Sequence, residues 1–442
     1  MSTIIRNGTL VTMNSRRDIL RADILIEGDR IKEIGELKGY KARQEIDAAG
    51  MLVIPGLIQS HIHLCQTLFR GAADDMELLD WLKQRIWPLE AAHDEESLYY
   101  SALLAAAELI SGATTSIIDM GTVRHSDSLF QAVKQSGLRY LGGKCMMDCG
   151  DEVPEELIDS REKSLQESMD LFERWNGQEQ GRIHYAFCPR FAVSCSEELL
   201  REVSQLSEKY KIPVHSHASE NRGEIKIVEE KRGLRNIPYF EQLGLCHEKV
   251  ILAHCIHINE EEMKILAEKQ VNVVHCPASN LKLASGLAPV PPLLDMGARV
   301  SLGADGAPCN NNLSQFMEMR LAALIHKPFY GPTSMPAEKV FEMATLGGAQ
   351  AMGQEEEIGS LEPGKKADLA IVNLGHWHNQ PATHSSVYSQ LVYQALSSDV
   401  RATMVDGRFL MQNAALLTID AEAVKINSEK ALDRILRRAG LK

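Results

Sequence analysis

The chain has 442 residues, 44% of them hydrophobic, and a net charge of −13 at pH 7. A chain of this size can bury large cores. Its scattered Lys and Arg residues form no basic patch, which argues against nucleic acid or a membrane surface as a partner and favours a small molecule. Nine irregularly spaced cysteines do not suggest a disulfide framework, and no signal or membrane-spanning segment is visible, so we expect a cytoplasmic protein.

The two ends of the chain share a pattern of short β-strands separated by turns. Residues 3–53 alternate β-type runs with turn signals. Residues 367–372 and 402–410 repeat that pattern near the other end. We therefore predict one small β-sandwich domain that is built from residues 1–56 and 359–442.

Residues 57–358 alternate apolar strand candidates with helical stretches rich in Leu, Glu and Ala. Together with the run that precedes them, there are eight strand candidates: residues 53–59, 115–119, 139–144, 183–187, 213–217, 250–254, 271–275 and 299–303. Alternating strands and helices imply a parallel sheet covered on both faces, and eight such units close a barrel. The sequence thus predicts an α/β fold with a (β/α)₈ TIM-type barrel, and a final helix over residues 421–442.

Five metal-competent side chains fall at the carboxyl ends of these strands, where barrels carry their chemistry. His61 and His63 are two residues apart and face the same side of a strand, while His217, His254 and Asp305 each end another strand. A catalytic Zn²⁺ or Fe²⁺ requires nitrogen and oxygen ligands with one open position. We predict one divalent metal per subunit, with Zn²⁺ preferred to Fe²⁺.

His215 and His217 compete for one ligand position, because both lie on the same face of one strand. His217 is nearer the strand end and has Glu220 three residues on, which favours His217 as the ligand and leaves His215 packed or behind the ligands. Residues 187–190 read Phe-Cys-Pro-Arg and lack the lysine that a two-metal hydrolase would carry there, so we expect a mononuclear site.

Glu220 is the candidate general acid and base. Coordination to a metal lowers the pKa of water from about 16 toward about 7, and the released proton needs an acceptor within hydrogen-bond reach. Glu220 suits that role, with His254 and Asp305 orienting the hydroxide and Asp305 also binding the metal. The alternative is that Glu220 only starts a helix beside Asn221 and Arg222.

Four segments carry a family resemblance: Val-Ile-Pro-Gly-Leu-Ile-Gln-Ser-His-Ile-His at residues 53–63, His-Ala-Ser-Glu-Asn at 217–221, His-Cys-Pro-Ala-Ser-Asn at 275–280, and Gly-Ser-Leu-Glu-Pro-Gly-Lys-Lys-Ala-Asp-Leu at 359–369. With them the chain resembles, over essentially its whole length, the mononuclear deaminase branch of the amidohydrolase superfamily, which contains adenosine-type deaminases, guanine deaminase and triazine hydrolases. The resemblance favours a homo-oligomer. It implies that the metal ligands are His61, His63, His217 and Asp305, and that Glu220, His254 and Asp305 are catalytic.

Two segments of the chain resemble deaminases that act on different substrates. The loop over residues 66–90 is similar to that of methylthioadenosine, S-adenosylhomocysteine and 5′-deoxyadenosine deaminases, which implies that Trp81 contacts the substrate and Glu90 holds the ribose hydroxyls. The alternative is that Glu90 faces solvent. The segment with Arg190 and Phe191 is closer to guanine deaminase, where the matching Arg and Phe engage the base, and the alternative for Arg190 is a structural ion pair.

The sequence therefore predicts a metal-dependent deaminase of adenine nucleosides, acting on 5′-deoxyadenosine, methylthioadenosine or S-adenosylhomocysteine. Metal-bound hydroxide would attack C6, and ammonia would leave. The alternative substrates are guanine or another aminated heterocycle, such as a pterin or a triazine. An alternative of another class is a non-catalytic scaffold, because fold alone does not establish function.

Overall fold

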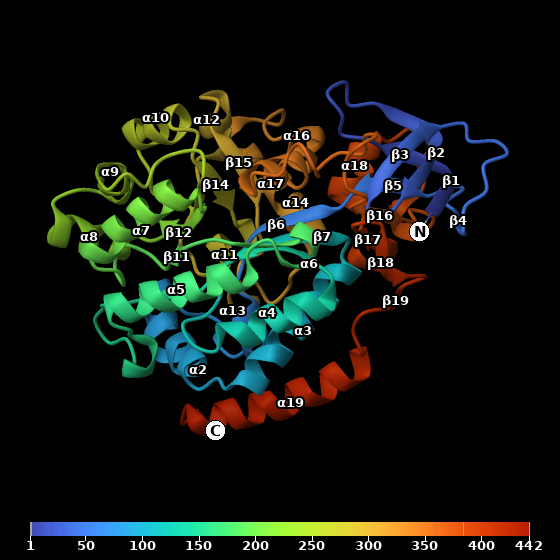
Figure 1. Cartoon of the computed structure of the whole chain (residues 1–442). Coiled ribbons are helices and arrows are strands. Elements are labelled where there is room, and N and C mark those ends of the chain that lie inside the picture. The colour runs from blue at the N-terminus through green and yellow to red at the C-terminus, as the bar shows by residue number, and fades with distance from the viewer. Residues whose placement is uncertain (1, 383, 442) are drawn as a thin grey trace.

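Parallel strands form a closed barrel at the centre of the computed structural model, which describes residues 2–382 and 384–441 (Figure 1). The barrel strands are β6 (Leu57–Ile62), β7 (Thr114–Asp119), β8 (Arg139–Gly142), β10 (Ile183–Tyr185), β12 (Val214–Ala218), β13 (Val250–His254), β14 (Asn272–His275) and β15 (Arg299–Leu302). They pair in the orders β10-β8-β7-β6 and β12-β13-β14-β15. Parallel bridges from Ile62 to Asp305 and from Phe187 to Val214 join the two halves, so the predicted (β/α)₈ barrel is confirmed.

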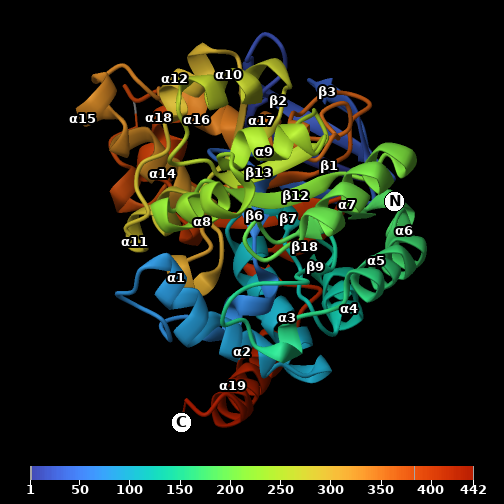
Figure 2. The same ribbon diagram turned by 90° about the vertical axis from the view of Figure 1, so that its left-hand side faces the viewer.

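Helices cover the outside of the barrel, which explains why its strands are apolar on both faces. Every residue of β6, β7, β12 and β13 is buried. Figure 2 shows these strands in the middle of the molecule, with α7 and α8 passing in front of them. The longer covering helices are α3 (Glu95–Ser111), α4 (Ser126–Ser136), α5 (Arg161–Trp175), α7 (Glu197–Tyr210), α8 (Arg222–Arg232), α9 (Asn236–Gln242), α10 (Glu260–Glu268), α14 (Gln315–Ile325) and α16 (Ala337–Met343).

Shorter helices fill the connections around the barrel ends. They are η1 (Leu64–Phe69), α1 (Leu78–Trp81), the π-helical turn η2 (Leu82–Ile86), α2 (Trp87–Ala91), η3 (Glu155–Leu157), α6 (Gln178–Gly181), α11 (Pro277–Lys282), α12 (Val290–Asp295), α13 (Ala307–Asn310), α15 (Lys327–Tyr330), α17 (Leu346–Ala351), η4 (Trp377–Asn379), α18 (Val387–Ser389), η5 (Gln390–Gln394) and η6 (Ser397–Asp399), while the two-residue strands β9 (Cys145–Met146) and β11 (Cys188–Pro189) pair with each other. No helix in the described part of the chain is long and apolar enough to cross a membrane.

Strands from both ends of the chain form a second sheet beside the barrel, at the upper right of Figure 1. Its strands are β1 (Ser2–Val11), β2 (Ile19–Glu27), β3 (Arg30–Gly35), β4 (Gln44–Asp47), β5 (Leu52–Pro55), β16 (Leu369–Val372), β17 (Val400–Val405), β18 (Arg408–Gln412) and β19 (Ala415–Leu416). The antiparallel pair β5 and β16 joins the two ends of the chain, so the strands make one continuous sheet. The domain division at residues 57 and 359 stays a prediction.

The apolar run that we predicted as one strand over residues 53–59 is divided between the two sheets. Strand β5 ends at Pro55 and β6 begins at Leu57, so the chain changes sheets at Gly56. A side chain at Gly56 would place its Cβ 2.0 Å from Thr115 Oγ1, so only glycine permits this close approach. The run therefore links the small sheet to the metal-competent end of the first barrel strand.

A buried ion pair also joins the barrel to the small sheet. Arg139, the first residue of β8, donates from Nε to Asp368 Oδ2 over 2.8 Å and from Nη2 to Asp406 Oδ1 over 2.5 Å. The predicted final helix is α19 (Ala421–Arg438), and its Ala431 and Ile435 pack in one cluster with Phe69 and Leu89 of the barrel side. In Figure 1 this helix runs along the lower edge, below α3.

Candidate functional site

The five predicted metal-competent side chains meet at the carboxyl end of the barrel. His61 lies on β6, His63 follows that strand, His217 lies on β12, His254 ends β13, and Asp305 follows β15. All five are buried. The ring centroid of His61 lies 5.0 Å from that of His63 and 4.8 Å from that of His217. Side chains from distant parts of the chain therefore form one cluster.

The ligand atoms of this cluster converge on a common point. The Nε2 atoms of His63 and His217 are 3.3 Å apart. Asp305 Oδ1 lies 3.3 Å from His61 Nε2 and 3.4 Å from His63 Nε2. Two overlapping groups of these side chains could hold a metal ion: His61, His63 and His217 form one, and His61, His254 and Asp305 form the other.

The hydrogen bonds behind the rings leave these nitrogens free to bind a metal. His217 Nδ1 donates to the backbone carbonyl of Arg190 over 2.6 Å, so its Nε2 carries a lone pair. His61 Nδ1 lies 2.8 Å from His215 Nε2, and its own Nε2 has no hydrogen-bond partner among the described residues although it is buried. Burial lowers the pKa of His61, His63 and His217, which favours the neutral ligand form.

These observations fit one divalent metal bound by His61, His63, His217 and Asp305. The donor set of three imidazoles and one carboxylate suits Zn²⁺ or Fe²⁺. His215 lies behind His61, which agrees with our expectation that it is packed behind the ligands. Its contact with His61 Nδ1 fixes the orientation of the His61 ring.

Glu220 lies beside this cluster and faces His254. Its Oε2 is 3.4 Å from His254 Nε2, and burial raises the pKa of Glu220 to about 7. A carboxyl group with such a pKa can both give and take a proton at neutral pH. The helix-start role belongs to other residues, because Asn221 and Glu224 form the capping box of α8. The cap of α8 therefore does not require the side chain of Glu220, which leaves this carboxyl group available for the acid and base role that we predicted from the sequence.

Further polar contacts hold the catalytic candidates in place. His254 Nδ1 lies 2.9 Å from Asn280 Oδ1, and Ser279 donates from Oγ to Asp305 Oδ2 over 2.7 Å. Ser285 Oγ is 3.5 Å from Glu220 Oε1. We predicted no role for these three residues from the sequence, although Ser279 and Asn280 belong to the segment at residues 275–280 that carries part of the family resemblance.

A small cavity adjoins the cluster. The space that the centres of water molecules could occupy in this cavity is about 30 Å³. The residues that line it are His63, Gln66, Leu78, Trp81, Leu82, Arg190, Phe191, His217, Glu220, His254, Leu283 and Asp305. Trp81 and Phe191, both predicted substrate contacts, are thus at the cavity. Leu78, Trp81 and Leu82 also form part of the wall of this cavity, next to the cluster.

Glu90 and Arg190, predicted as separate substrate contacts, form an ion pair with each other. Arg190 donates from Nη1 to Glu90 Oε2 over 2.6 Å and from Nη2 to Oε1 over 3.3 Å. The exposed fractions are 6% for Glu90 and 5% for Arg190, so the alternative that Glu90 faces solvent is wrong. Arg190 lines the cavity, and Glu90 lies behind it. The carboxylate raises the pKa of Arg190 despite its burial, and the guanidinium stays charged.

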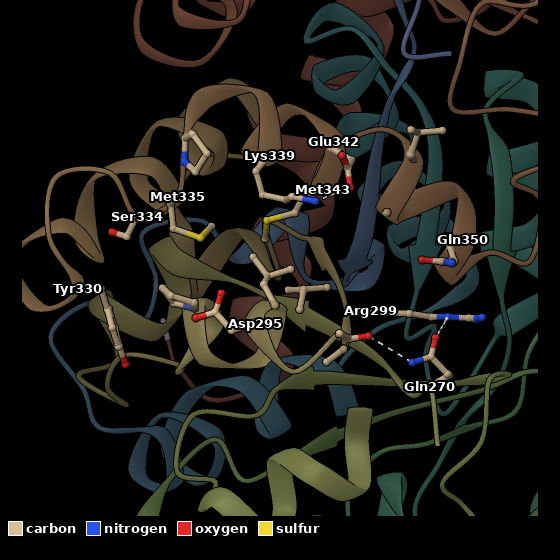
Figure 3. A pocket seen from close by; sticks show the side chains of 18 of the residues that line it. Gln270, Asp295, Arg299, Tyr330, Ser334, Met335, Lys339, Glu342, Met343 and Gln350 are labelled. Carbon is tan, nitrogen blue, oxygen red and sulfur yellow. Dashed lines mark hydrogen bonds and ion pairs between the residues drawn. The ribbon is translucent and has the colours of Figure 1, made fainter. Parts of the chain in front are cut away.

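A larger cavity lies elsewhere and contains none of the predicted site residues. The space that the centres of water molecules could occupy in this cavity is about 880 Å³. Its lining includes Arg299, the first residue of β15, so the cavity opens at the amino end of that strand (Figure 3). Gln270 and Arg299 hydrogen-bond at one side, while Met335 and Met343 lie across the middle. In barrels of this type the chemistry takes place at the opposite end of the strands, which favours the small cavity beside the histidine cluster as the active site.

Comparison with known proteins identifies the family. Residues 52–410 match the Amidohydrolase family. The chain is 39% identical over 438 residues to a 5′-deoxyadenosine deaminase of Methanosarcina acetivorans, covering 99% of both chains. The chain belongs to the amidohydrolase family.

Other amidohydrolases share its full length. This amidohydrolase is 36% identical over 441 residues to a 5-methylthioadenosine/S-adenosylhomocysteine deaminase of Syntrophomonas wolfei, covering 99% of this chain and 100% of that one. The crystal structure of an adenosine deaminase from Xanthomonas campestris with bound zinc superimposes with a TM-score of 0.92 at 30% identity, covering 98% of each chain. The barrel and the small sheet of this amidohydrolase are thus arranged as in a solved zinc protein.

Proposed function

We propose that this amidohydrolase is a metal-dependent aminohydrolase that removes the 6-amino group of adenine nucleosides, with 5′-deoxyadenosine, methylthioadenosine or S-adenosylhomocysteine as its substrate. One observation supports the reaction class: Glu220 lines the same cavity as His63, His217 and Asp305, and it lies 3.4 Å from His254. The substrate class is supported by the full-length similarity to proteins named as deaminases of such nucleosides.

We propose one divalent metal per subunit, held by His61, His63, His217 and Asp305, with Zn²⁺ preferred and Fe²⁺ as the alternative. When bound, such an ion would lower the pKa of a water molecule and so supply a nucleophile at neutral pH. The neutral, lone-pair-bearing nitrogens described above support this ligand set.

The protein's own residues manage the protons of the reaction. Glu220 takes the proton from the attacking water and delivers it to N1 of the adenine ring, which makes C6 electrophilic. His254 lies between Glu220 and Asp305, at 3.4 Å and 3.9 Å, where it orients the attacking oxygen through Nε2. As the tetrahedral carbon collapses, Glu220 takes the proton of the hydroxyl group at C6 and passes it to the departing amino group, while N1 keeps its proton and the carbonyl at C6 forms. The products are ammonia and the inosine analogue.

The cavity walls provide binding and orientation for the base and sugar. Trp81 and Phe191 offer aromatic surface to the heterocycle, and Arg190 offers N–H donors. We place Glu90 in substrate binding through the guanidinium of Arg190, which it holds with both carboxylate oxygens.

Guanine or another aminated heterocycle, such as a pterin or a triazine, is the second candidate substrate. The observation that favours it is that Arg190 and Phe191, the pair resembling guanine deaminase, both line the cavity. Guanidinium N–H groups donate and never accept, so Arg190 suits a carbonyl oxygen of a free base as well as a ring nitrogen. Turnover of guanine with inert nucleosides would support this candidate.

We further propose a cytoplasmic homo-oligomer that binds neither nucleic acid nor membrane. The net charge of −13 and the scattered basic residues support the lack of a nucleic-acid surface. A non-catalytic scaffold is the alternative of another class, and a purified protein that binds no metal would favour it.

The test of the chemistry is ammonia release by the Glu220→Gln variant with 5′-deoxyadenosine. The amide cannot take up or deliver the proton, so we expect kcat to fall by about 10² to 10⁴-fold while bound metal stays near one ion per chain. Glu230→Gln, the same change at an exposed position on α8, serves as the control and should keep full activity. A Glu220→Gln protein with most of its activity would contradict the assigned role.

A further inference from the structure

Gln66 lines the active-site cavity, and its buried amide oxygen has no hydrogen-bond partner among the described residues. Gln66 lies on η1, three residues after His63, and the residue is 1% exposed. The amide nitrogen Nε2 donates to Glu90 Oε1 over 2.8 Å. Because the Glu90 carboxylate is paired with Arg190, it only accepts hydrogen bonds, so the nitrogen of the Gln66 amide must face Glu90. The amide oxygen must then face the other way.

The amide oxygen of Gln66 has no hydrogen-bond partner within residues 2–382 and 384–441, although it is buried. It lies against Gly306, where an added Cβ would sit 2.1 Å from it, so even an alanine there would crowd this oxygen. Buried polar atoms in native proteins nearly always have partners, and an unpaired one at a cavity wall is a place where a ligand donor fits. Gln66 lines the same cavity as Glu220 and Arg190.

Glu90 thus connects an acceptor and a donor on the cavity wall. It holds Gln66 through one hydrogen bond and Arg190 through two, with its own carboxylate behind both of them. Gln66 Oε1 accepts, while Arg190 only donates. A substrate that satisfies both must carry a donor and an acceptor near each other on one edge.

We propose that Gln66 is a specificity-determining residue that accepts a hydrogen bond from the 2′-hydroxyl of a nucleoside, while Arg190 donates to N3 of its adenine ring. This inference rests on the proposed function. In an adenine nucleoside, N3 and the 2′-hydroxyl flank the glycosidic bond, which puts an acceptor and a donor on one edge of the molecule. N1 lies on the ring side that Glu220 must reach. Glu90 is then a positioning residue that sets the direction of both contacts.

The proposal is tested by comparing 5′-deoxyadenosine with its 2′-deoxy analogue, in the wild-type enzyme and in the Gln66→Met variant. Methionine has a similar length and no acceptor of comparable strength. We expect the wild-type kcat/KM to be about 10 to 100-fold higher for the ribonucleoside, because the analogue leaves Gln66 Oε1 unpaired. In Gln66→Met this ratio should fall to within twofold of one. Gln131→Met, the same change at an exposed position on α4, should keep the wild-type ratio.

Each result has a separate meaning. Equal turnover of both nucleosides by the wild type, or an unchanged ratio in Gln66→Met, would overturn the assignment of Gln66 and leave deamination intact. An enzyme inert to every adenine nucleoside would overturn the proposed function and this assignment with it. If Gln66→Met does not fold, the ratio in the wild type still decides, together with a 3-deaza analogue that removes the acceptor for Arg190 and should likewise be about 10 to 100-fold poorer.

Discussion

Replacing His215 by leucine should weaken metal binding, although His215 is not among the ligands that we propose. In the structure, His61 Nδ1 lies 2.8 Å from His215 Nε2, and both side chains are fully buried. His215 accepts the Nδ1 proton of His61, which leaves the lone pair of His61 on Nε2, where the cluster needs it. Leucine cannot accept, and buried water has no room to replace the imidazole.

The size of the effect follows from these contacts. A buried donor that loses its partner costs about 1 to 3 kcal/mol, and the other tautomer of His61 would carry a proton on the ligand atom. Removing a residue that supports a metal ligand in this way typically lowers affinity 10 to 100-fold, which corresponds to about 1.4 to 2.7 kcal/mol. The two figures agree, so we expect the dissociation constant for Zn²⁺ to rise about 10 to 100-fold in His215→Leu.

The assay is a competition titration of metal-free protein against a chelating indicator. His275→Leu is the matched control, because it removes another buried imidazole whose Nε2 lies 3.3 Å from His326 Nε2, at the end of β14 but away from the ligand atoms. His275→Leu should keep wild-type affinity for the metal. If His215→Leu bound Zn²⁺ within twofold of wild type, or if His275→Leu were weakened equally, the reasoning would be refuted.

Three further predictions concern stability and access to the site. Arg139→Met should lower the free energy of unfolding by about 3 to 5 kcal/mol, because it leaves the buried carboxylate of Asp368 without its cation and leaves Asp406 with Lys366 alone; urea denaturation measures this, and a loss under 1 kcal/mol would contradict it. Trp81→Ala should raise KM about tenfold or more with little change in unfolding, since Trp81 covers the cavity, and an unchanged KM would show that it does not contact the substrate. Burial raises the pKa of Glu318 from its ordinary 4.5 to about 8, so the folded state binds more protons than the unfolded state between these values, and stability should fall as the pH rises from about 4.5 to about 8. Glu318→Gln should flatten that part of the pH profile, and a profile identical to wild type would contradict the assignment.

The sequence predicted the barrel because its strands have a simple pattern. Each is a short apolar run, and several end in a histidine or an aspartate. Parallel strands in a barrel bring their carboxyl ends together, so His61, His217, His254 and Asp305 could be grouped without knowing any distance. The same logic separated His217 from His215, since the residue nearer the strand end reaches the open side.

Contacts between side chains from different loops could not be predicted in this way. Glu90 and Arg190 are 100 residues apart, and each alone was compatible with solvent, substrate or an ion pair. Their pairing, and the orientation that it imposes on Gln66, depends on how two loops pack. The division of the first apolar run at Gly56 was missed because hydrophobicity continues on both sides of it, although Pro55-Gly56 is a turn signal that could have marked the break.

Backbone conformation at the catalytic residues was also beyond the sequence. His254 and Asp305 have φ values of 73° and 61°, in the left-handed region that side-chain-bearing residues rarely adopt. Such conformations persist when the surrounding structure enforces them and are concentrated at functional sites. In this structure the left-handed conformation occurs at the last residue of β13, His254, and three residues after β15, at Asp305, where both side chains join the histidine cluster.

The central claim is deamination of an adenine nucleoside, and the most direct test is ammonia release by the metal-loaded protein across one panel of substrates. The panel contains 5′-deoxyadenosine, methylthioadenosine, S-adenosylhomocysteine, adenosine, guanine and a pterin. We predict that the adenine nucleosides, led by a 5′-deoxy or 5′-thio compound, release ammonia with kcat/KM at least about 100-fold above guanine and the pterin, within the range that hydrogen-bond recognition can supply. Turnover of guanine or the pterin while all the nucleosides remain inert would contradict the claim.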